Sequence, residues 1–177
     1  MAKASEQIID EILVIDCQAG RAQAMEALVS RWQKRLWQHA YRLVGDVDAA
    51  WDVTQQSWLA IIKGIRKLHD PAHFKAWAYR ITTNKAVDWI KRDRRTKQID
   101  MEAKQDPTSR VAHDLDAREL LAQLDLKKRV VLNLYYFEQL NISEISHALR
   151  IPPGTVKSRL HNAKKELKQI WEKTIDE

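Results

Sequence analysis

The sequence predicts an all-α protein made of two small helical domains joined by a flexible linker. Only four Gly and four Pro occur among 177 residues, whereas 31% of the residues are charged and good helix formers such as Ala, Leu, Lys, Gln and Glu are frequent. Apolar residues recur at three- and four-residue spacing through two blocks, and a polar stretch separates these blocks. The 45% hydrophobic content can supply the core of one ordinary domain or of two smaller ones.

The first block has the apolar pattern of several packed helices. Asp46-Val47-Asp48 interrupts this pattern, and a new helix is expected over residues 50–65. The turn-forming tripeptide His69-Asp70-Pro71 ends that helix. A further helix is expected over residues 71–95.

Residues 96–114 are predicted to form a solvated linker. The stretch is polar, its apolar residues are scattered, and Asp106-Pro107 favours a turn. This boundary places one domain at residues 5–95 and a second domain at residues 115–174. Four successive helices are expected in the second domain, over residues 115–124, 125–137, 141–149 and 153–171.

The last two of these helices form a predicted helix-turn-helix. Asn141 and Glu144 fit a capping box, in which the Asn side chain accepts a hydrogen bond from an unpaired amide and the Glu side chain accepts one from the cap amide. Ile151-Pro152 ends the first helix after two turns, and Pro153 suits the first position of the next helix. A short helix, a tight turn and a second helix are typical of a DNA-binding unit.

The second helix of this unit has one apolar face and one cationic, hydrogen-bonding face. The apolar residues step by three or four positions and are expected to pack inward: Val156, Leu160, Ala163, Leu167 and Ile170. The opposite face carries Lys157, Ser158, His161, Asn162, Lys165 and Lys168. For an isolated amphipathic helix, a solvated basic face would be the simpler interpretation. The preceding capped helix and turn instead favour a recognition helix in the major groove, with Arg159 nearer the core flank as a phosphate contact.

The run IPPGTVKSRLHNAKK at residues 151–165 resembles the helix-turn-helix with which extracytoplasmic-function sigma factors, of the sigma-70 family, recognise the minus-35 promoter element. Arg150 stands where this family often has Gly, and Asn162 replaces a frequent Arg. Output domains of response regulators share a Gly-Thr-Val-Lys helix, so a free-standing transcriptional activator or repressor is an alternative. The resemblance implies minus-35 contacts by Thr155, Lys157, Ser158, Arg159, His161, Asn162 and Lys165.

The predicted helix over residues 71–95 has an apolar edge near its start and a cluster of cations near its end. The edge consists of Phe74, Trp77, Ala78 and Ile81. The cations can follow DNA phosphates, and Asn84 can hydrogen-bond an unstacked base. The segment resembles the sigma-family pattern Phe-x-x-Trp-Leu-Tyr-Arg-Ile-x-x-Asn-x-x-x-Asp, which binds and melts the minus-10 element. The resemblance implies that the loop at residues 67–73 and Asn84 capture a flipped base, and assigns to minus-10 DNA Arg80, Asn84, Lys85, Asp88, Lys91, Arg92, Arg94 and Arg95.

A third segment, DVTQQSW at residues 52–58, could be any amphipathic helix. It resembles the sigma-family pattern Asp-x-x-Gln-Glu-x-Phe that docks on the clamp helices of RNA polymerase, and this implies contacts from Asp52, Gln55 and Gln56. The three signatures occur in the family's order, and the resemblance covers about residues 5–171. It implies a sigma region 2 helical bundle and a sigma region 4 helix-turn-helix, and a non-enzymatic subunit that directs core RNA polymerase to promoter DNA.

Other chemistry is not indicated. The sequence has no Walker loop, Rossmann glycine pattern, nucleophile elbow or paired CxxC motif, so no enzyme activity and no cofactor are predicted. His69 and His73 could be imagined as metal ligands, but Pro71 favours a loop between them, so we predict no metal site. Trp32, Trp37 and Trp58 are interpreted as packing residues, because a Trp at helical spacing is more often part of a core.

Charge and cysteine content indicate the compartment and the kind of partner. Thirty Lys and Arg against 24 Asp and Glu give a net charge of +6, which suits a polyanion such as DNA. A single cysteine, Cys17, cannot form an internal disulfide, and the apolar stretches are too short to cross a bilayer. We expect a cytoplasmic protein without membrane insertion. Many family members are held by an anti-sigma factor, and the sequence leaves such a partner open.

Overall fold

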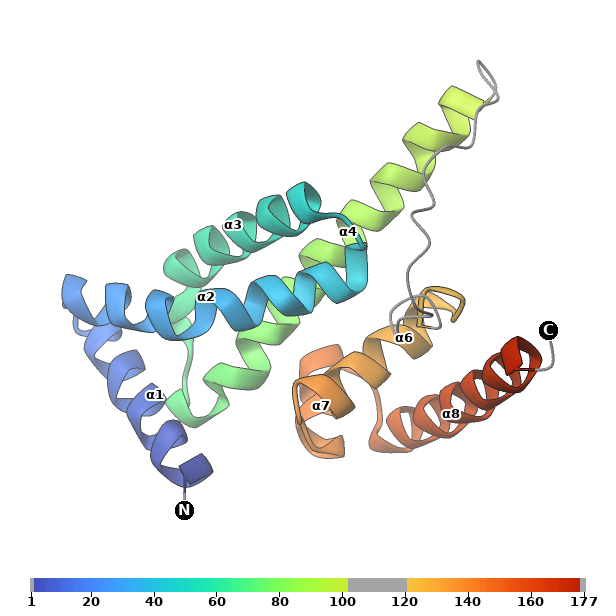
Figure 1. Cartoon of the computed structure of the whole chain (residues 1–177). Helices are drawn as coiled ribbons and strands as arrows, with labels where there is room; N and C mark the ends of the chain where they lie inside the picture. Colours follow the sequence, from blue (N-terminus) through green and yellow to red (C-terminus); the bar gives the residue numbers. More distant parts are fainter. Residues whose placement is uncertain (1, 102–120, 176–177) are drawn as a thin grey trace.

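The structure is a computed structural model that describes residues 2–101 and 121–175, with side chains described over residues 5–97 and 121–173 (Figure 1). All regular secondary structure in these ranges is helical, which confirms the predicted all-α class. Most of the predicted linker, and the predicted helix at residues 115–124 up to residue 120, lie outside the described residues. The described part forms an N-terminal bundle and a C-terminal helical unit that packs beside it.

The N-terminal bundle contains four α-helices. Helices α2 and α3 each pack against α4, and α1 packs across α2. Two short 3-10 helices, η1 (Ile65–Lys67) and η2 (Pro71–His73), connect α3 to α4. The α-helices span α1 (Ala2–Gln18), α2 (Ala22–Val44), α3 (Val47–Gly64) and α4 (Phe74–Met101).

Local signals place the ends of these helices close to their predicted positions. Gly45 ends α2 with a left-handed φ of 82°, and the Asp46 side chain caps α3 by accepting a hydrogen bond from the Ala49 amide at 2.8 Å. Asp70 caps η2, so the α-helix begins at Phe74 rather than at Pro71. Helix α4 also continues past the predicted end at residue 95, where an Asp93–Lys97 ion pair of 2.9 Å joins successive turns.

Trp32 forms the centre of the bundle core. Its indole is 1% exposed and meets two rings of α4 nearly edge-on, with centroid distances of 5.3 Å to Phe74 and 5.8 Å to Tyr79. Trp58 is also buried, and Trp37 is half-buried with its ring stacked on Tyr41, so the three tryptophans pack as predicted. These contacts fix the position of α4 on α2.

The C-terminal unit contains the predicted helix-turn-helix. One continuous helix was expected over residues 125–137, but α6 (Leu126–Leu132) is followed by a π-helical turn, η3 (Asn133–Phe137). The Glu138 amide donates to the Asn133 carbonyl at 3.1 Å and closes this wider turn. The recognition unit follows as α7 (Ile142–Leu149) and α8 (Pro153–Ile175).

The predicted capping box of α7 is confirmed. The Glu144 amide donates to Asn141 Oδ1 at 2.9 Å, and the Asn141 amide donates to Glu144 Oε2 at 2.6 Å. At the other end of α7, Arg150 adopts a left-handed conformation with φ 53° and ψ 45°. Since this conformation is the one that helix C-terminal glycines supply without strain, the family's frequent Gly at this position has a physical reason.

Replacing Arg150 by glycine should stabilise the C-terminal unit. Arg150→Gly removes the steric cost of a left-handed residue with a Cβ atom, and we expect the free energy of unfolding to rise by about 0.5–1 kcal/mol relative to Arg150→Ala. Arg150→Ala is the matched control, because it removes the same charge and keeps the Cβ atom. Chemical denaturation followed by circular dichroism measures the difference. An alanine variant as stable as the glycine variant would contradict this explanation.

Candidate nucleic-acid interface

Helix α8 presents a polar face whose position is set by burial of its opposite face. Val156, Leu160 and Ala163 are buried, which turns the intervening positions outward. The Ser158 hydroxyl donates to the Thr155 carbonyl at 3.0 Å, so its oxygen remains available as an acceptor. Of the predicted minus-35 residues, Thr155 and Arg159 are half-buried, and the exposed ones are Lys157, Ser158, His161, Asn162 and Lys165.

Helix α4 carries the second group of predicted DNA contacts. Its inner face is buried through Ala78, Ala86 and Ile90, so the polar residues lie on the remaining surface. Arg80 and Lys85 are half-buried, whereas the other predicted minus-10 residues are exposed. The exposed group consists of Asn84, Asp88, Lys91, Arg92, Arg94 and Arg95.

Trp77 of α4 packs against the C-terminal end of α3. A Cβ atom added to Gly64, the last residue of α3, would lie 3.0 Å from Cζ2 of the Trp77 indole. The absence of a side chain at Gly64 therefore allows the indole to approach the end of α3 closely. The Trp77 ring also lies 6.2 Å from that of Phe74, which continues the core of the bundle toward α3.

Helix α3 presents a surface of a different kind. Asp52 and Gln55 are exposed and Gln56 is half-buried, on a helix whose opposite face is buried. Sequence reasoning missed three apolar side chains that share this outer surface: Trp51, Leu59 and Ile62, which are 41%, 59% and 48% exposed. Trp51 and Leu59 lie four residues and Ile62 lies seven residues from Gln55, and this helical spacing was the available signal. An apolar strip flanked by carboxylate and amide groups suits a protein partner better than it suits DNA.

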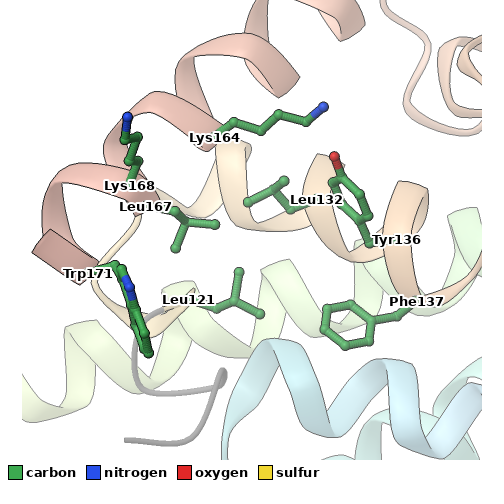
Figure 2. Close-up of a pocket in the computed structure, with 8 residues that line it drawn as sticks. All are labelled: Leu121, Leu132, Tyr136, Phe137, Lys164, Leu167, Lys168 and Trp171. Atoms are coloured by element: carbon green, nitrogen blue, oxygen red, sulfur yellow. The ribbon is translucent and has the colours of Figure 1, made fainter.

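An apolar groove of about 530 Å³ lies between the π-helical turn and α8 (Figure 2). Leu121, Leu132 and Leu167 converge on its middle, while Trp171 and Phe137 lie toward its two ends. Lys164 and Lys168 line it from α8, and the Lys164 ammonium lies 5.4 Å from the centroid of the Tyr136 ring. Sequence reasoning did not predict this groove, because its lining residues come from separate segments that meet only in the folded chain.

The two helical units meet at a buried carboxylate. Glu138 follows the π-helical turn and is only 8% exposed, and its Oε1 accepts a hydrogen bond of 2.8 Å from Nη1 of Arg42 on α2. The fully buried His39 places Nδ1 3.5 Å from the same oxygen, and its Nε2 lies 2.8 Å from the Thr83 hydroxyl of α4. Burial favours a higher pKa for Glu138, but hydrogen bonds and charges from His39, Tyr79 and Arg42 together hold that pKa below its usual value.

Cations of the two units also approach one another. Burial and then the charge of Arg150 lower the pKa of Arg80 on α4. Burial lowers the pKa of Arg129 on α6, and the charge of Arg94 on α4 lowers it further. Helix α7 packs against α4 at this junction. Like charges of the two units therefore act on one another at Arg80 and Arg94 of the predicted minus-10 helix.

The described residues offer little support for other chemistry. Within residues 5–97 and 121–173, no group of three His, Cys, Asp or Glu side chains is arranged to hold a metal ion. His73 pairs with Asp70 at 2.9 Å, and His69 is exposed. Cys17 is buried, and burial raises the pKa of its thiol. No helix in the described part of the chain is long and apolar enough to span a membrane.

Comparison with known proteins matches both helical units to one family. The family model described as sigma-70 region 2 matches residues 28–96, and the model described as sigma-70, region 4 matches residues 114–167. The ECF RNA polymerase sigma factor SigL of Mycobacterium tuberculosis is 30% identical over 160 residues, which cover 85% of this chain and 90% of SigL.

Two solved structures share the fold. CnrH, in complex with the cytosolic domain of CnrY, superimposes with a TM-score of 0.73 at 24% identity, over 93% of this chain and 97% of CnrH. The sigma factor RpoE from Bartonella quintana, in complex with the anti-sigma factor NepR, gives a TM-score of 0.69 at 19% identity, over 83% of this chain and 96% of RpoE. At these identities, the similarity establishes the common helical architecture.

Proposed function

Because this chain belongs to the extracytoplasmic-function sigma factors of the sigma-70 family, which direct transcription initiation by RNA polymerase, we propose that three of its helices divide the work of promoter recognition. Helix α8 contacts the minus-35 duplex, α4 binds and opens the minus-10 element, and α3 docks on the polymerase. The observation that carries this assignment is that each of these helices buries one face and leaves its predicted contact residues largely on the opposite face.

The minus-35 assignment rests on the chemistry of the outer face of α8. Lys157 and Lys165 can neutralise phosphates, and half-buried Arg159 can hold a phosphate from the flank. Ser158, His161 and Asn162 are short exposed polar groups that can donate to or accept from base edges in the major groove. Thr155 lies at the start of the helix, where a backbone or hydroxyl contact to a phosphate is favourable.

The minus-10 assignment rests on the separation of polar and cationic groups along α4. Asn84 offers both a donor and an acceptor to an unstacked base, and Arg80, Lys85 and Asp88 surround it. The exposed cations toward the end of α4 can follow the phosphates of a separated strand. They are Lys91, Arg92, Arg94 and Arg95.

The remaining roles follow from the family. We assign residues 5–95 to sigma region 2, 96–114 to a linker and 115–174 to sigma region 4. The polymerase performs the chemistry and this chain contributes no catalytic group, in the cytoplasm where polymerase works. The RpoE structure contains an anti-sigma factor, and a protein of that kind is the corresponding candidate inhibitor of this chain.

Run-off transcription tests the function directly. Core polymerase lacking sigma is mixed with this chain and a promoter library that varies the minus-35 and minus-10 elements. Transcripts should require both proteins and should start downstream of paired elements. Tight binding of the chain alone to duplex DNA, without any transcripts, would instead support a free-standing activator or repressor.

Lys157→Ala and Arg94→Ala should weaken DNA binding and leave docking on core polymerase intact. Each variant removes about one phosphate contact, so the slope of log affinity against log salt should decrease in magnitude by about one. Anisotropy of labelled promoter DNA with the assembled holoenzyme measures this slope. Lys34→Ala, at an exposed position on α2, is the control for loss of one positive charge. Loss of core docking in either test variant would contradict the proposed division.

Asp52→Ala and Gln55→Ala should weaken docking on core polymerase and leave DNA binding intact. Each should weaken binding to core polymerase by about tenfold, because a polar contact at a protein interface is commonly worth about 1–2 kcal/mol. Binding of the free chain to DNA should not change. Affinity for immobilised core polymerase gives the measurement, with Gln23→Ala on the exposed surface of α2 as the control. Unchanged core binding in both variants would remove α3 from the proposed docking surface.

A further inference from the structure

Glu138 forms a bridge between the two helical units. It comes from the turn after η3, and its partners Arg42 and His39 lie on α2, 96 and 99 residues earlier in the sequence. The Arg42 guanidinium also lies 4.6 Å from the centroid of the Phe137 ring, so the residue before Glu138 takes part in the same contact. The Glu138 carboxylate is thus bound by Arg42, whose guanidinium also contacts the Phe137 ring, and it is almost completely shielded from water.

The rest of the junction offers few other attractive charges. The charge of Arg150 acts on Arg80, the charge of Arg94 acts on Arg129, and the rings of His73 and His147 lie 6.1 Å apart. Each of these pairs joins a cationic or protonatable group of one unit with one of the other. Facing cations repel. Asp70 pairs with His73 and the charge of Asp125 acts on Arg129, while the buried Glu138 carboxylate is a negative charge that joins the two units directly.

Helix α7 packs against α4, and the charge of Arg150 at the end of α7 acts on Arg80, one of the predicted minus-10 contacts. A DNA strand bound along Arg80 would therefore meet α7 and Arg150 in this arrangement. Arg80 and Arg94, which face cations here, are groups that phosphates would neutralise in a DNA complex. A DNA strand at Arg80 and a C-terminal unit packed as in this structure would therefore compete for the same part of α4.

We propose that the Glu138–Arg42–His39 contact is an intramolecular restraint that holds the C-terminal unit over the minus-10 face of α4, and that this contact must break before α4 binds DNA. The inference rests on the proposed function of α4. The restraint lowers the fraction of molecules that can bind, and apparent DNA affinity falls by the same fraction. Opening becomes favourable when DNA phosphates bind cations of α4 such as Arg80 and Arg94, because these new contacts offset the loss of the Glu138–Arg42 contact.

Glu138→Gln tests the restraint, because it removes the charge and keeps the size of the side chain. Fluorescent dyes are attached at exposed positions of the two units through Lys63→Cys and Gln169→Cys, while the buried Cys17 remains unlabelled. In the free chain, Glu138→Gln should broaden and shift the distribution of energy-transfer efficiency. It should also tighten binding of a mixed-sequence single-stranded oligonucleotide by about fivefold, in the usual range of coupling between two sites.

Two further variants separate the restraint from simpler effects. Glu172→Gln makes the same charge change on exposed α8 and should alter DNA affinity much less, which accounts for the gain of one net positive charge. Arg42→Gln breaks the contact from the other unit and should change energy transfer as Glu138→Gln does. The double variant should add little to either single variant, because both remove one interaction. Circular dichroism of each variant verifies that the helices are retained.

The outcomes distinguish failure of the restraint from failure of the proposed function. Unchanged energy transfer in both Glu138→Gln and Arg42→Gln would overturn the restraint, whatever the transcription assay shows. Altered energy transfer with unchanged single-strand binding would overturn the claim that the contact blocks α4. Absence of transcripts from the whole promoter library would refute the sigma assignment, while the energy-transfer and oligonucleotide measurements would still decide whether the contact restrains DNA binding.

Discussion

The edge-on packing of Trp32 against Phe74 and Tyr79 fixes the geometry on which the other surfaces depend. These three rings join α2 to α4, and they determine which residues of α4 face outward. Tyr79 lies in the core with its ring 5.1 Å from His39, while Arg80, the next residue, lies at the surface. The same packing thus sets the minus-10 face of α4 and places His39 where it can approach Glu138. The ring contacts of the core therefore extend through Tyr79 and His39 to Glu138 at the junction between the two units.

The sequence was sufficient to predict features that depend on neighbouring residues. The all-α class, the capping box at Asn141 and the polar outer face of α8 follow from helix periodicity and local hydrogen bonding, and the structure has each of them. The resemblance to sigma factors also rested on contiguous signatures, and comparison with known families confirms it. The contact roles of individual residues on α3, α4 and α8 remain predictions that the proposed binding measurements address.

Features that depend on distant parts of the chain were not predictable in this way. The π-helical turn interrupts an apolar pattern that looks like one helix, and its extra residue per turn changes which side chain is buried. Glu138 is therefore buried next to Arg42, although a lone glutamate after an aromatic run is ordinarily solvated. The groove beside Trp171 has the same origin, since residues from separate helices line it. The spacing of apolar residues predicts the buried face of a single helix, but it does not predict which residues of different helices come into contact.

The energetics of a buried ion pair explain why such a contact is suited to a reversible role. Desolvation of Glu138 and Arg42 offsets most of the attraction between them, so the intact pair adds little net stability. Loss of Arg42 is costly, however, because the Glu138 carboxylate then remains buried without this charged partner. The pair therefore adds little to the free energy of this arrangement of the two units, but it disfavours arrangements in which Glu138 would be buried without Arg42. Opening exposes both charges to water together, so the contact can break when DNA binds α4 without unfolding of either helical unit.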